Sequence, residues 1–383
     1  MPNVLLRIIV REWRRILVEK RVVALLIGGP CFYALLFGGV YWQGRTMHVP
    51  IAIVDQDHSA LSRDIASALG SSESLAVVEW ADAPGDFLPL LRQEKAYACV
   101  VFPAHFERDL LAGRGPRVEA ILDGSNVLIA GNALSGIRGV LATYQVATDS
   151  RELAVSGVAQ TATKALARPI EPVMRPLFNP TSNYSHFMLM CLVCIAVQSV
   201  TRMACGVALG LDDREQFERD SGRTIPGTLW LFFGKVIASA TLVFLAGGTA
   251  LVLTFALFGA PIRGSILSIS VAMALFAIIQ VCIAYGYYSL FRNTLICLQF
   301  HIFSAVVFAV MAGYTWPSLA MPSVLRWASE AIPISHMITI VRRTALMGAS
   351  SMQLWGHFLW LAVWMLISLA WGYWAVHRRF SEN

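Results

Sequence analysis

The sequence of 383 residues predicts an all-α transmembrane domain of six helices, with an N-terminal interfacial helix and outer re-entrant or interfacial helices, into which an α/β extracytoplasmic domain is inserted. Hydrophobic residues make up 56% of the chain and charged residues 14%, which is more apolar surface than one soluble core can hide. Six runs lack Lys, Arg, Asp and Glu, and a helix of about 20 such residues crosses a hydrocarbon core of about 30 Å. These runs are residues 22–42, 184–201, 236–260, 265–291, 293–316 and 354–376.

The N-terminal segment, residues 1–21, has the pattern of an amphipathic helix lying in the cytoplasmic interface. Apolar residues fall on one helical face and arginines on the other. A solvated basic leader is the alternative, but it would not need the apolar stripe. The long apolar run at 22–42 without an A-x-A-like cleavage site favours a retained first span over a signal peptide. The stripe consists of Val4, Leu5, Ile8, Ile9, Trp13, Ile16 and Leu17.

Residues 43–183 have the composition of a soluble domain. VPIAIVD (49–55) and AYACVVF (96–102) are typical of buried strands and alternate with amphipathic helical stretches, so we expect a small α/β sheet. From Asn126 to about Arg168 the pattern is helical and Ala-rich, and a proline-rich linker then leads back to the membrane.

Basic residues are distributed unevenly between the segments that connect the spans. With both termini cytoplasmic, the inner segments hold more Arg and Lys than the short outer ones, as the positive-inside rule requires. The net charge of +6 therefore needs no nucleic-acid partner. We expect a multi-pass protein of a cytoplasmic membrane, residues 184–383 forming its second to sixth spans.

Five polar residues within or beside the spans are candidates for a substrate pathway, because polar groups in hydrocarbon are costly unless they face protein or water. The alternative is structural: Arg202 and Lys235 would only extend to the cytoplasmic interface, and the glutamines would bond between helices. The candidates are Gln198, Arg202, Gln280, Gln299 and His301.

The segment 313–348 is interrupted by three X-Pro steps, which disfavour helix at each preceding residue. We expect two short amphipathic helices, 323–332 and 334–348, lying in or dipping back into the outer leaflet. Such a segment predicts an outer gate, with a purely structural lid as the alternative. The candidate gate residues are Trp316, Pro317, Met321, Pro322, Trp327 and Pro333.

The sequence contains neither a phosphate-binding loop nor a nucleophile motif of the kinds that catalysis would require. Residues 227–236 are the nearest match to a phosphate-binding G-x-x-x-x-G-K-[ST] loop, and they fail in spacing and in the residue after Lys235. No G-x-S-x-G motif occurs. The stretch DQDHS (55–59) has metal-binding residue types, although a strand end followed by a helix cap explains it as well. We therefore expect no catalytic site, no metal and no cofactor bound by this chain.

The order of elements and several motifs resemble the ABC-2 type permeases of bacterial ABC exporters, in the branch with a large outer domain after the first span. The resemblance covers essentially the whole chain. It rests on VPIAIVDQDHSALSRDIASAL, VVFPAHFERDLLAG, VEAILDGSN and FNPTSNYSHF, and most specifically on GYTWPSLAMP followed by WASEAIPISHMITIVRRTALMG.

The resemblance implies an export permease without ATPase activity of its own. ATP and Mg would be bound by a separate ATP-binding cassette subunit, and the permease would pair with a second copy or a paralogue, with a periplasmic adaptor as a further partner. A multidrug-type efflux function is expected for hydrophobic or amphipathic compounds. Export of a lipid, glycan or other envelope component is the alternative, and a membrane-anchored binding or signalling protein is the alternative of another class.

The charged loop 211–227 would form the coupling helix that docks into the ATPase subunit. Eight of its seventeen residues are charged, so it cannot be buried. It departs from the family pattern at Arg223, which separates Gly222 from the following threonine. The residues implied in coupling are Glu215, Phe217, Glu218, Arg219 and Thr224.

Overall fold

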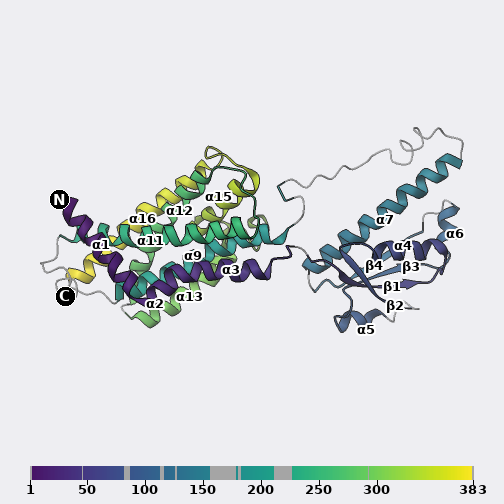
Figure 1. Ribbon diagram of the computed structural model, residues 1–383, viewed down its shortest axis with the longest axis horizontal. Coiled ribbons are helices and arrows are strands. Elements are labelled where there is room, and N and C mark those ends of the chain that lie inside the picture. Colours follow the sequence, from purple (N-terminus) through teal and green to yellow (C-terminus); the bar gives the residue numbers. More distant parts are fainter. Residues whose placement is uncertain are drawn as a thin grey trace. The chain divides into compact units, whose positions relative to one another are not determined.

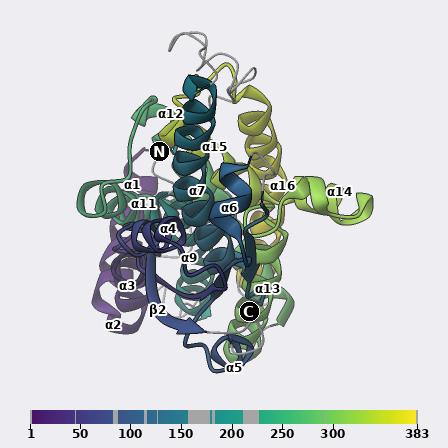
Figure 2. The ribbon, with the colours of Figure 1, turned by 90° about the vertical axis from the view of Figure 1, so that its right-hand side faces the viewer.

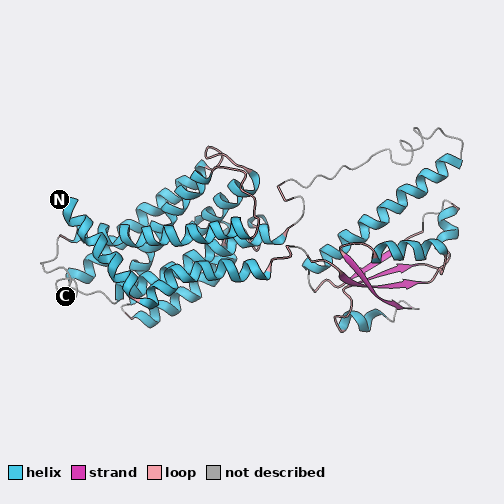
Figure 3. Cartoon of the chain, in the orientation of Figure 1, coloured by secondary structure: helices cyan, strands magenta, loops and turns pink. Residues whose placement is uncertain are grey.

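The chain divides into two compact units, one made of residues 1–44 and 176–383 and the other of residues 45–175. The first unit is a bundle of helices, and the second contains all the strands (Figure 3). The computed structural model describes residues 2–44, 46–81, 87–112, 116–125, 127–155, 178–179, 183–210, 227–291 and 293–381.

The helical bundle has two ends that are used as reference points below. The N-terminal helix and the last turns of the C-terminal helix lie at one end, which we call the terminal end (Figure 1). The opposite end, where α15 lies, is called the far end. The helices are α1 (Pro2–Val18), α2 (Lys20–Val23), α3 (Gly29–Val40), α9 (Tyr184–Gly210), α11 (Thr228–Leu257), α12 (Ile266–Phe291), α13 (Thr294–Met311), α14 (Ser323–Ala331), α15 (Pro333–Met347) and α16 (Trp355–Ser381).

Five helices in the described residues are long and apolar enough to cross a membrane. The first of them is composite, because α2 and α3 are joined by a π-helical turn, Ala24–Gly28, directly before Pro30. A proline lacks the backbone N–H that an α-helix needs, so a π turn at this point is physically reasonable. The five spans are Lys20–Val40, Tyr184–Leu209, Thr228–Leu257, Ile266–Phe291 and Trp355–Arg378.

The fifth predicted span is shorter than its apolar run. Helix α13 starts after Asn293, whose side chain accepts hydrogen bonds from the backbone N–H groups of Leu295 and Ile296, and it ends at Met311. Gly313 follows with a φ of +73°, a backbone conformation that L side chains rarely adopt, so the helix cannot continue to Trp316. The count of six spans stays a prediction.

Two predicted span limits are wrong. Helix α9 continues past residue 201 to Gly210, and α11 begins at Thr228 instead of residue 236. The prediction stopped at the first charged residue, whereas the backbone hydrogen bonds of a helix continue through it. As a result both Arg202 and Lys235 lie inside membrane-spanning helices.

The far end contains the two short helices predicted from the X-Pro steps. Their limits agree closely with the prediction, but α15 does not have the exposed polar face that was predicted for it. The position of both helices in the outer leaflet stays a prediction. Apart from a few positions, α15 is buried, and it packs against α9, α12 and α16. Helix α14 is exposed on its apolar face and stands out from the side of the bundle (Figure 2).

The second unit is built on a four-stranded sheet with the order β2-β1-β3-β4. Strand β1 is parallel to both β2 and β3, and β4 is antiparallel to β3, so the sheet is mixed. The predicted small α/β sheet is confirmed. Its elements are β1 (Val49–Asp55), α4 (Ala60–Gly70), β2 (Leu75–Ala81), α5 (Phe87–Arg92), β3 (Ala98–Phe102), α6 (Phe106–Leu111), β4 (Glu119–Leu122) and α7 (Val127–Val155).

Both faces of this sheet are covered, which explains the uninterrupted apolar sequence of its central strands. On one face Ile51 and Ile53 of β1 pack with Ile65 of α4 and Ile137 of α7. On the other face Ala52 and Val54 pack with Phe87 of α5. The predicted Ala-rich helix is confirmed as α7 up to Val155, and the predicted linker at 168–180 lies almost entirely outside the described residues.

Candidate functional site

Among the described residues of the helical bundle, two buried polar clusters stand out, one around the carboxylate of Glu12 and one around the guanidinium of Arg202. The first, which we call the Glu12 cluster, consists of Arg11, Glu12, Arg15 and Lys235. The second, the Arg202 cluster, consists of Gln198, Arg202, Gln280 and His301. Buried polar groups are costly inside apolar helices unless they are paired, so each cluster needs an explanation.

The Glu12 cluster joins α1 to the start of α11. Lys235 is 0% exposed, and its Nζ lies 2.9 Å from Oε1 of Glu12. Arg11 and Arg15 also contact this carboxylate, at 2.7 and 2.8 Å. Arg15 donates a further hydrogen bond to the carbonyl of Ala208 at 2.7 Å, which ties α1 to α9. Lys235 therefore ends in a buried ion pair with α1, a partner that the sequence did not predict.

Close packing between α1 and α11 places these charges together. At Gly234 an ideal Cβ would lie 2.4 Å from Cγ2 of Ile8, so only glycine allows this approach. One turn further along α1, Trp13 donates a hydrogen bond from Nε1 to the carbonyl of Ala238 at 3.0 Å. Glycine at 234 thus brings α1 near enough for Glu12 to reach the next residue, Lys235.

Sequence reasoning missed Glu12. The available signal was a single acidic residue among four arginines on a helix with an apolar stripe. Arg11 and Arg15 are close to Glu12 in sequence and are sufficient partners for its carboxylate. Nothing in the sequence therefore indicated a distant partner such as Lys235.

The Arg202 cluster consists of buried side chains from α9, α12 and α13, with Gln198 one turn before Arg202 on α9. Arg202 is 3% exposed, and its Nε donates to Oε1 of Gln280 at 2.6 Å. Its guanidinium carbon lies 5.3 Å from the centre of the Phe308 ring and 6.0 Å from that of Tyr287. Tyr287 also contacts the ring of His301, with centres 5.2 Å apart. Aromatic faces can stabilise a desolvated guanidinium.

Four of the five predicted pathway residues are deeply buried, and one is not. Gln198, Gln280 and His301 are at most 1% exposed. Gln299, two residues before His301 on α13, is exposed on the opposite side of that helix and is not part of the cluster. Whether the buried four line a pathway is a proposal taken up below.

The predicted gate residues are spread over a turn and two helices at the far end. Trp316 and Trp327 are exposed, the latter at 70%, whereas Pro333 is buried at the first turn of α15. The adjoining Tyr314 is buried and stacks on Phe187 of α9, with ring centres 4.5 Å apart. These residues therefore do not form one compact site in this structure.

A histidine pair at the far end was not predicted. Nε2 of His336 lies 2.7 Å from the carbonyl oxygen of Glu330, and its Nδ1 lies 3.0 Å from Nδ1 of His357. Because a carbonyl only accepts, Nε2 carries the proton and the Nδ1 of a neutral His336 accepts from His357. Trp364 of α16 donates to the carbonyl of Ala331 at 2.6 Å, so the turn between α14 and α15 is fixed to α16 twice.

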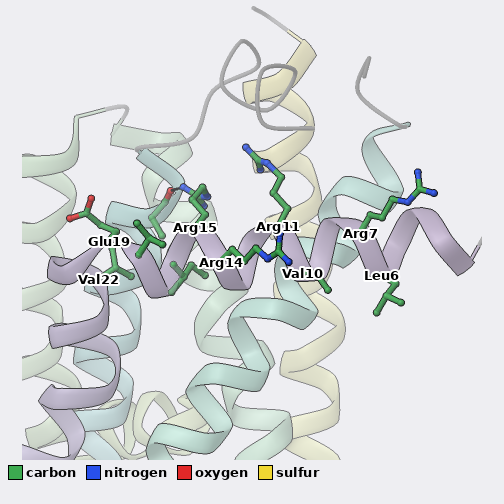
Figure 4. A pocket seen from close by; sticks show the side chains of 11 residues that line it. Leu6, Arg7, Val10, Arg11, Arg14, Arg15, Glu19 and Val22 are labelled. Atoms are coloured by element: carbon green, nitrogen blue, oxygen red, sulfur yellow. Dashed lines mark hydrogen bonds between the residues drawn. The ribbon is translucent and has the colours of Figure 1, made fainter. Parts of the chain in front are cut away.

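A groove of about 800 Å³ runs along α1 and reaches Ala208, near the end of α9. In Figure 4 the side chains of Arg7 and Arg11 extend to one side of α1, and those of Leu6 and Val10 to the other. The groove is therefore both basic and apolar. Its lining also includes Arg14, Arg15, Ile16, Val18, Glu19 and Val22.

The predicted coupling residues lie just beyond this groove in sequence. Residues 211–226, which include Glu215, Phe217, Glu218, Arg219 and Thr224, lie outside the described residues. Their role in coupling stays a prediction.

In the second unit, the DQDHS stretch forms a turn and caps two helices. The carboxylate of Asp55 accepts from the N–H groups of Asp57 and His58 and from the hydroxyl of Ser62, and Ser59 caps α4. Burial raises the pKa of Asp57, but hydrogen bonds from Ser59 and from backbone N–H groups at the start of α6 outweigh it and hold the pKa below its usual value. Among the described residues, no group of three His, Cys, Asp or Glu side chains could hold a metal.

Known proteins are similar in sequence to this chain over most of its length. A family model described as "ABC-2 family transporter protein" matches residues 20–374. The chain is 24% identical over 367 residues to "Probable multidrug ABC transporter permease YbhR" of Escherichia coli K12, covering 93% of this chain and 92% of the relative. It is 24% identical over 365 residues to "Inner membrane transport permease YhhJ" of the same organism, covering 92% and 91%.

Proposed function

The chain belongs to the ABC-2 family of transporter proteins, and from that premise we propose that it is the membrane-spanning permease subunit of an ATP-driven exporter. The proposed cargo is a hydrophobic or amphipathic compound, taken from the cytoplasm or the inner leaflet. The names of the relatives, one of them a probable multidrug permease, support efflux over export of an envelope component.

The observation that carries a transport function is the Arg202 cluster. A bundle that served only as an anchor would gain nothing from an arginine, two glutamines and a histidine buried among apolar helices, because each costs free energy there. Polar groups inside membrane helices are typical of substrate and ion pathways. We therefore assign Gln198, Arg202, Gln280 and His301 to the pathway and leave out Gln299, which is exposed.

The proposed topology has six spans with both termini cytoplasmic. Helix α13 has 18 residues, which corresponds to about 27 Å at 1.5 Å per residue and nearly equals a hydrocarbon core of about 30 Å. With α13 as the fifth span, the terminal end of the bundle faces the cytoplasm. The unit formed by residues 45–175 is then extracytoplasmic.

ATP and Mg would be bound by a separate ATP-binding cassette subunit. The basic groove on α1 supports docking of that subunit at the terminal end, since it reaches the end of α9, where the predicted coupling loop begins. Glu215, Phe217, Glu218, Arg219 and Thr224 are proposed to transmit its closure to the spans.

Further partners are proposed at the exposed apolar surfaces. Phe303 of α13 and Val324 and Trp327 of α14 are exposed at 69, 77 and 70%, so lipid or a second permease must cover them. A copy of this chain or a paralogue would complete the exporter, and an adaptor would bind the extracytoplasmic unit. The far-end segment, with Trp316, Pro317, Met321, Pro322, Trp327 and Pro333, stays the proposed outer gate.

Purification of the tagged chain from the membranes of its native host tests this function. We expect an ATP-binding cassette subunit to co-purify, with ATPase activity that amphiphilic compounds stimulate. Reversing two charges, in Glu215→Lys with Glu218→Lys, should weaken that stimulation. The matched control is Glu330→Lys, which reverses an exposed charge at the far end.

Two results would count against the proposal. If no ATP-binding subunit accompanies the chain, the exporter function is wrong. If the doubly reversed variant keeps full stimulation, the coupling role of the loop is wrong and the exporter function stands.

A further inference from the structure

Arg202 is a buried cation without a carboxylate partner. Among the described residues, the ion pairs of the helical bundle involve Arg11, Arg15, Arg21 and Lys235, and none involves Arg202. It contacts the amide oxygen of Gln280 and the faces of two aromatic rings. Neutral groups stabilise the guanidinium without cancelling its charge.

Several polar atoms around Arg202 also lack a partner, although they are buried. They are Nη1 of Arg202, Nε2 of Gln280, both amide atoms of Gln198 and Nδ1 of His301. A buried polar atom without a partner is destabilising, and native proteins rarely leave several together. The cluster is therefore unlike a polar contact that only joins helices.

The Arg202 cluster has more hydrogen-bond donors than acceptors. Arg202 can only donate, so its contact fixes Oε1 of Gln280 as an acceptor and leaves Nε2 of Gln280 as a donor. The atoms without partners then include donor nitrogens on Arg202, Gln280 and Gln198, against one oxygen, on Gln198, while Nδ1 of His301 donates or accepts according to its tautomer. Carboxylate, sulfonate and phosphate groups carry negative charge and several acceptor oxygens, so they can accept hydrogen bonds from these donors.

The cluster lies at a depth that suits an amphiphile. Arg202 is eight residues from the end of α9, and His301 is seven residues from the start of α13, which places both about 10 to 12 Å from the terminal end of the bundle. An anionic group at that depth leaves its apolar tail beside apolar helix surfaces. Among the described helices, α13 covers the cluster from one side, and it packs chiefly against α9.

We propose that the Arg202 cluster binds the anionic group of the exported compound, and that the substrates are amphiphiles carrying a carboxylate, sulfonate or phosphate. This inference rests on the proposed transport function. Arg202 supplies the charge, Gln198 and Gln280 supply further donors, and the rings of Tyr287 and Phe308 form apolar walls. Displacement of α13 from α9 admits the ligand.

The test uses two fluorescent probes that differ only in charge. The complex of the chain with its ATP-binding subunit is placed in phosphatidylcholine nanodiscs and titrated with 11-(dansylamino)undecanoic acid and with the corresponding uncharged amide. We expect the acid to bind at least about tenfold more tightly than the amide, as a charge-assisted contact requires. In proteoliposomes the acid should be the preferred transport substrate.

Variants of the cluster should remove the preference for the acid. Arg202→Gln should weaken binding of the acid by about tenfold and leave binding of the amide unchanged. Arg202→Lys should retain part of the preference, because it keeps the charge. His301→Gln is a second variant, used if Arg202→Gln does not fold, and it should reduce the preference less. The control is Gln299→Ala, an exposed position on the same helix, which should match the wild type.

The outcomes separate the inference from the function on which it rests. If acid and amide bind and are transported equally, and Arg202→Gln changes neither, the anionic substrate class is wrong and the exporter function stands. If neither probe binds and ATP drives no transport of any amphiphile, both are wrong. If phosphatidylglycerol in the nanodiscs displaces the acid and the acid is not transported, the cluster holds a bilayer lipid and the substrate assignment is overturned.

Discussion

Lys235 and Arg202 are both cations buried in membrane-spanning helices, and they differ in what balances their charge. Each lies seven or eight residues from the terminal end of its helix, which is about 10 to 12 Å. Lys235 contacts the carboxylate of Glu12 at 2.9 Å, and two arginines complete that cluster. Arg202 contacts a neutral amide at 2.6 Å.

This difference separates a structural role from a functional one. A buried ion pair with further hydrogen bonds can be stable. Removing one partner leaves an unpaired buried charge, which lowers the stability of the fold. A buried cation balanced only by neutral groups keeps its attraction for an anion that arrives later. The two clusters therefore predict opposite effects of substitution on stability and on binding.

The largest expected effect is from Glu12→Gln. It leaves Lys235, Arg11 and Arg15 around a neutral amide, and breaking a buried pair in this way costs about 3 to 5 kcal/mol. We expect a fall of roughly 10 °C in the Tm of the purified protein, measured by circular dichroism in detergent.

Glu19→Gln is the matched control, because Glu19 forms only an exposed pair with Arg21 at 3.9 Å. The double variant Glu12→Gln with Lys235→Met should recover much of the lost stability, since no buried charge is then left at residue 235. Equal Tm values for Glu12→Gln and Glu19→Gln would show that the Glu12 cluster is not structural.

A smaller effect is expected from Gly234→Ala, which changes neither charge. The added Cβ would lie 2.4 Å from Ile8, so α1 must move away from α11 at a cost of about 1 to 3 kcal/mol. The same thermal unfolding measurement applies, with Gly248→Ala as the control, because a Cβ at Gly248 on the same helix meets no atom within 4 Å. A Tm for Gly234→Ala at or above that of the control would mean that α1 does not depend on this contact.

The smallest effect on stability is expected from Arg202→Met. The variant loses one hydrogen bond to Gln280 and its contacts with two rings, but it leaves no unpaired carboxylate and buries an apolar side chain. We expect the free energy of unfolding to change by no more than about 1 kcal/mol. If Arg202→Met lowers the free energy of unfolding as much as Glu12→Gln does, the Arg202 cluster is structural like the Glu12 cluster.

The sequence predicted the local features of the fold well. Charge-free apolar runs located the spans, the X-Pro steps located the breaks around α14 and α15, and continuous apolar stretches located β1 and β3. Each of these signals depends on residues that are close together in the chain, where periodicity and backbone sterics act directly.

The pairing of Lys235 could not be predicted in the same way. Glu12 and Lys235 are 223 residues apart, and nothing near Lys235 in sequence indicates a carboxylate. The two-faced pattern of residues 334–348 was likewise misleading, because α9, α12 and α16 cover the polar positions of α15 as well as the apolar ones. Contacts between distant parts of the chain decide both cases, and such contacts cannot be inferred from a single sequence.

The distance between Glu12 and Lys235 along the chain has a consequence for biosynthesis. At roughly 5 to 20 residues per second, the ribosome adds the intervening 223 residues in roughly 10 to 45 s, and during that time Glu12 has only Arg11 and Arg15 as partners. Helix α1 can take its final position only after two further spans have been made. A chain that ends before Lys235 would lack this partner for Glu12, so we expect α1 to pack stably only in chains that extend past the start of α11.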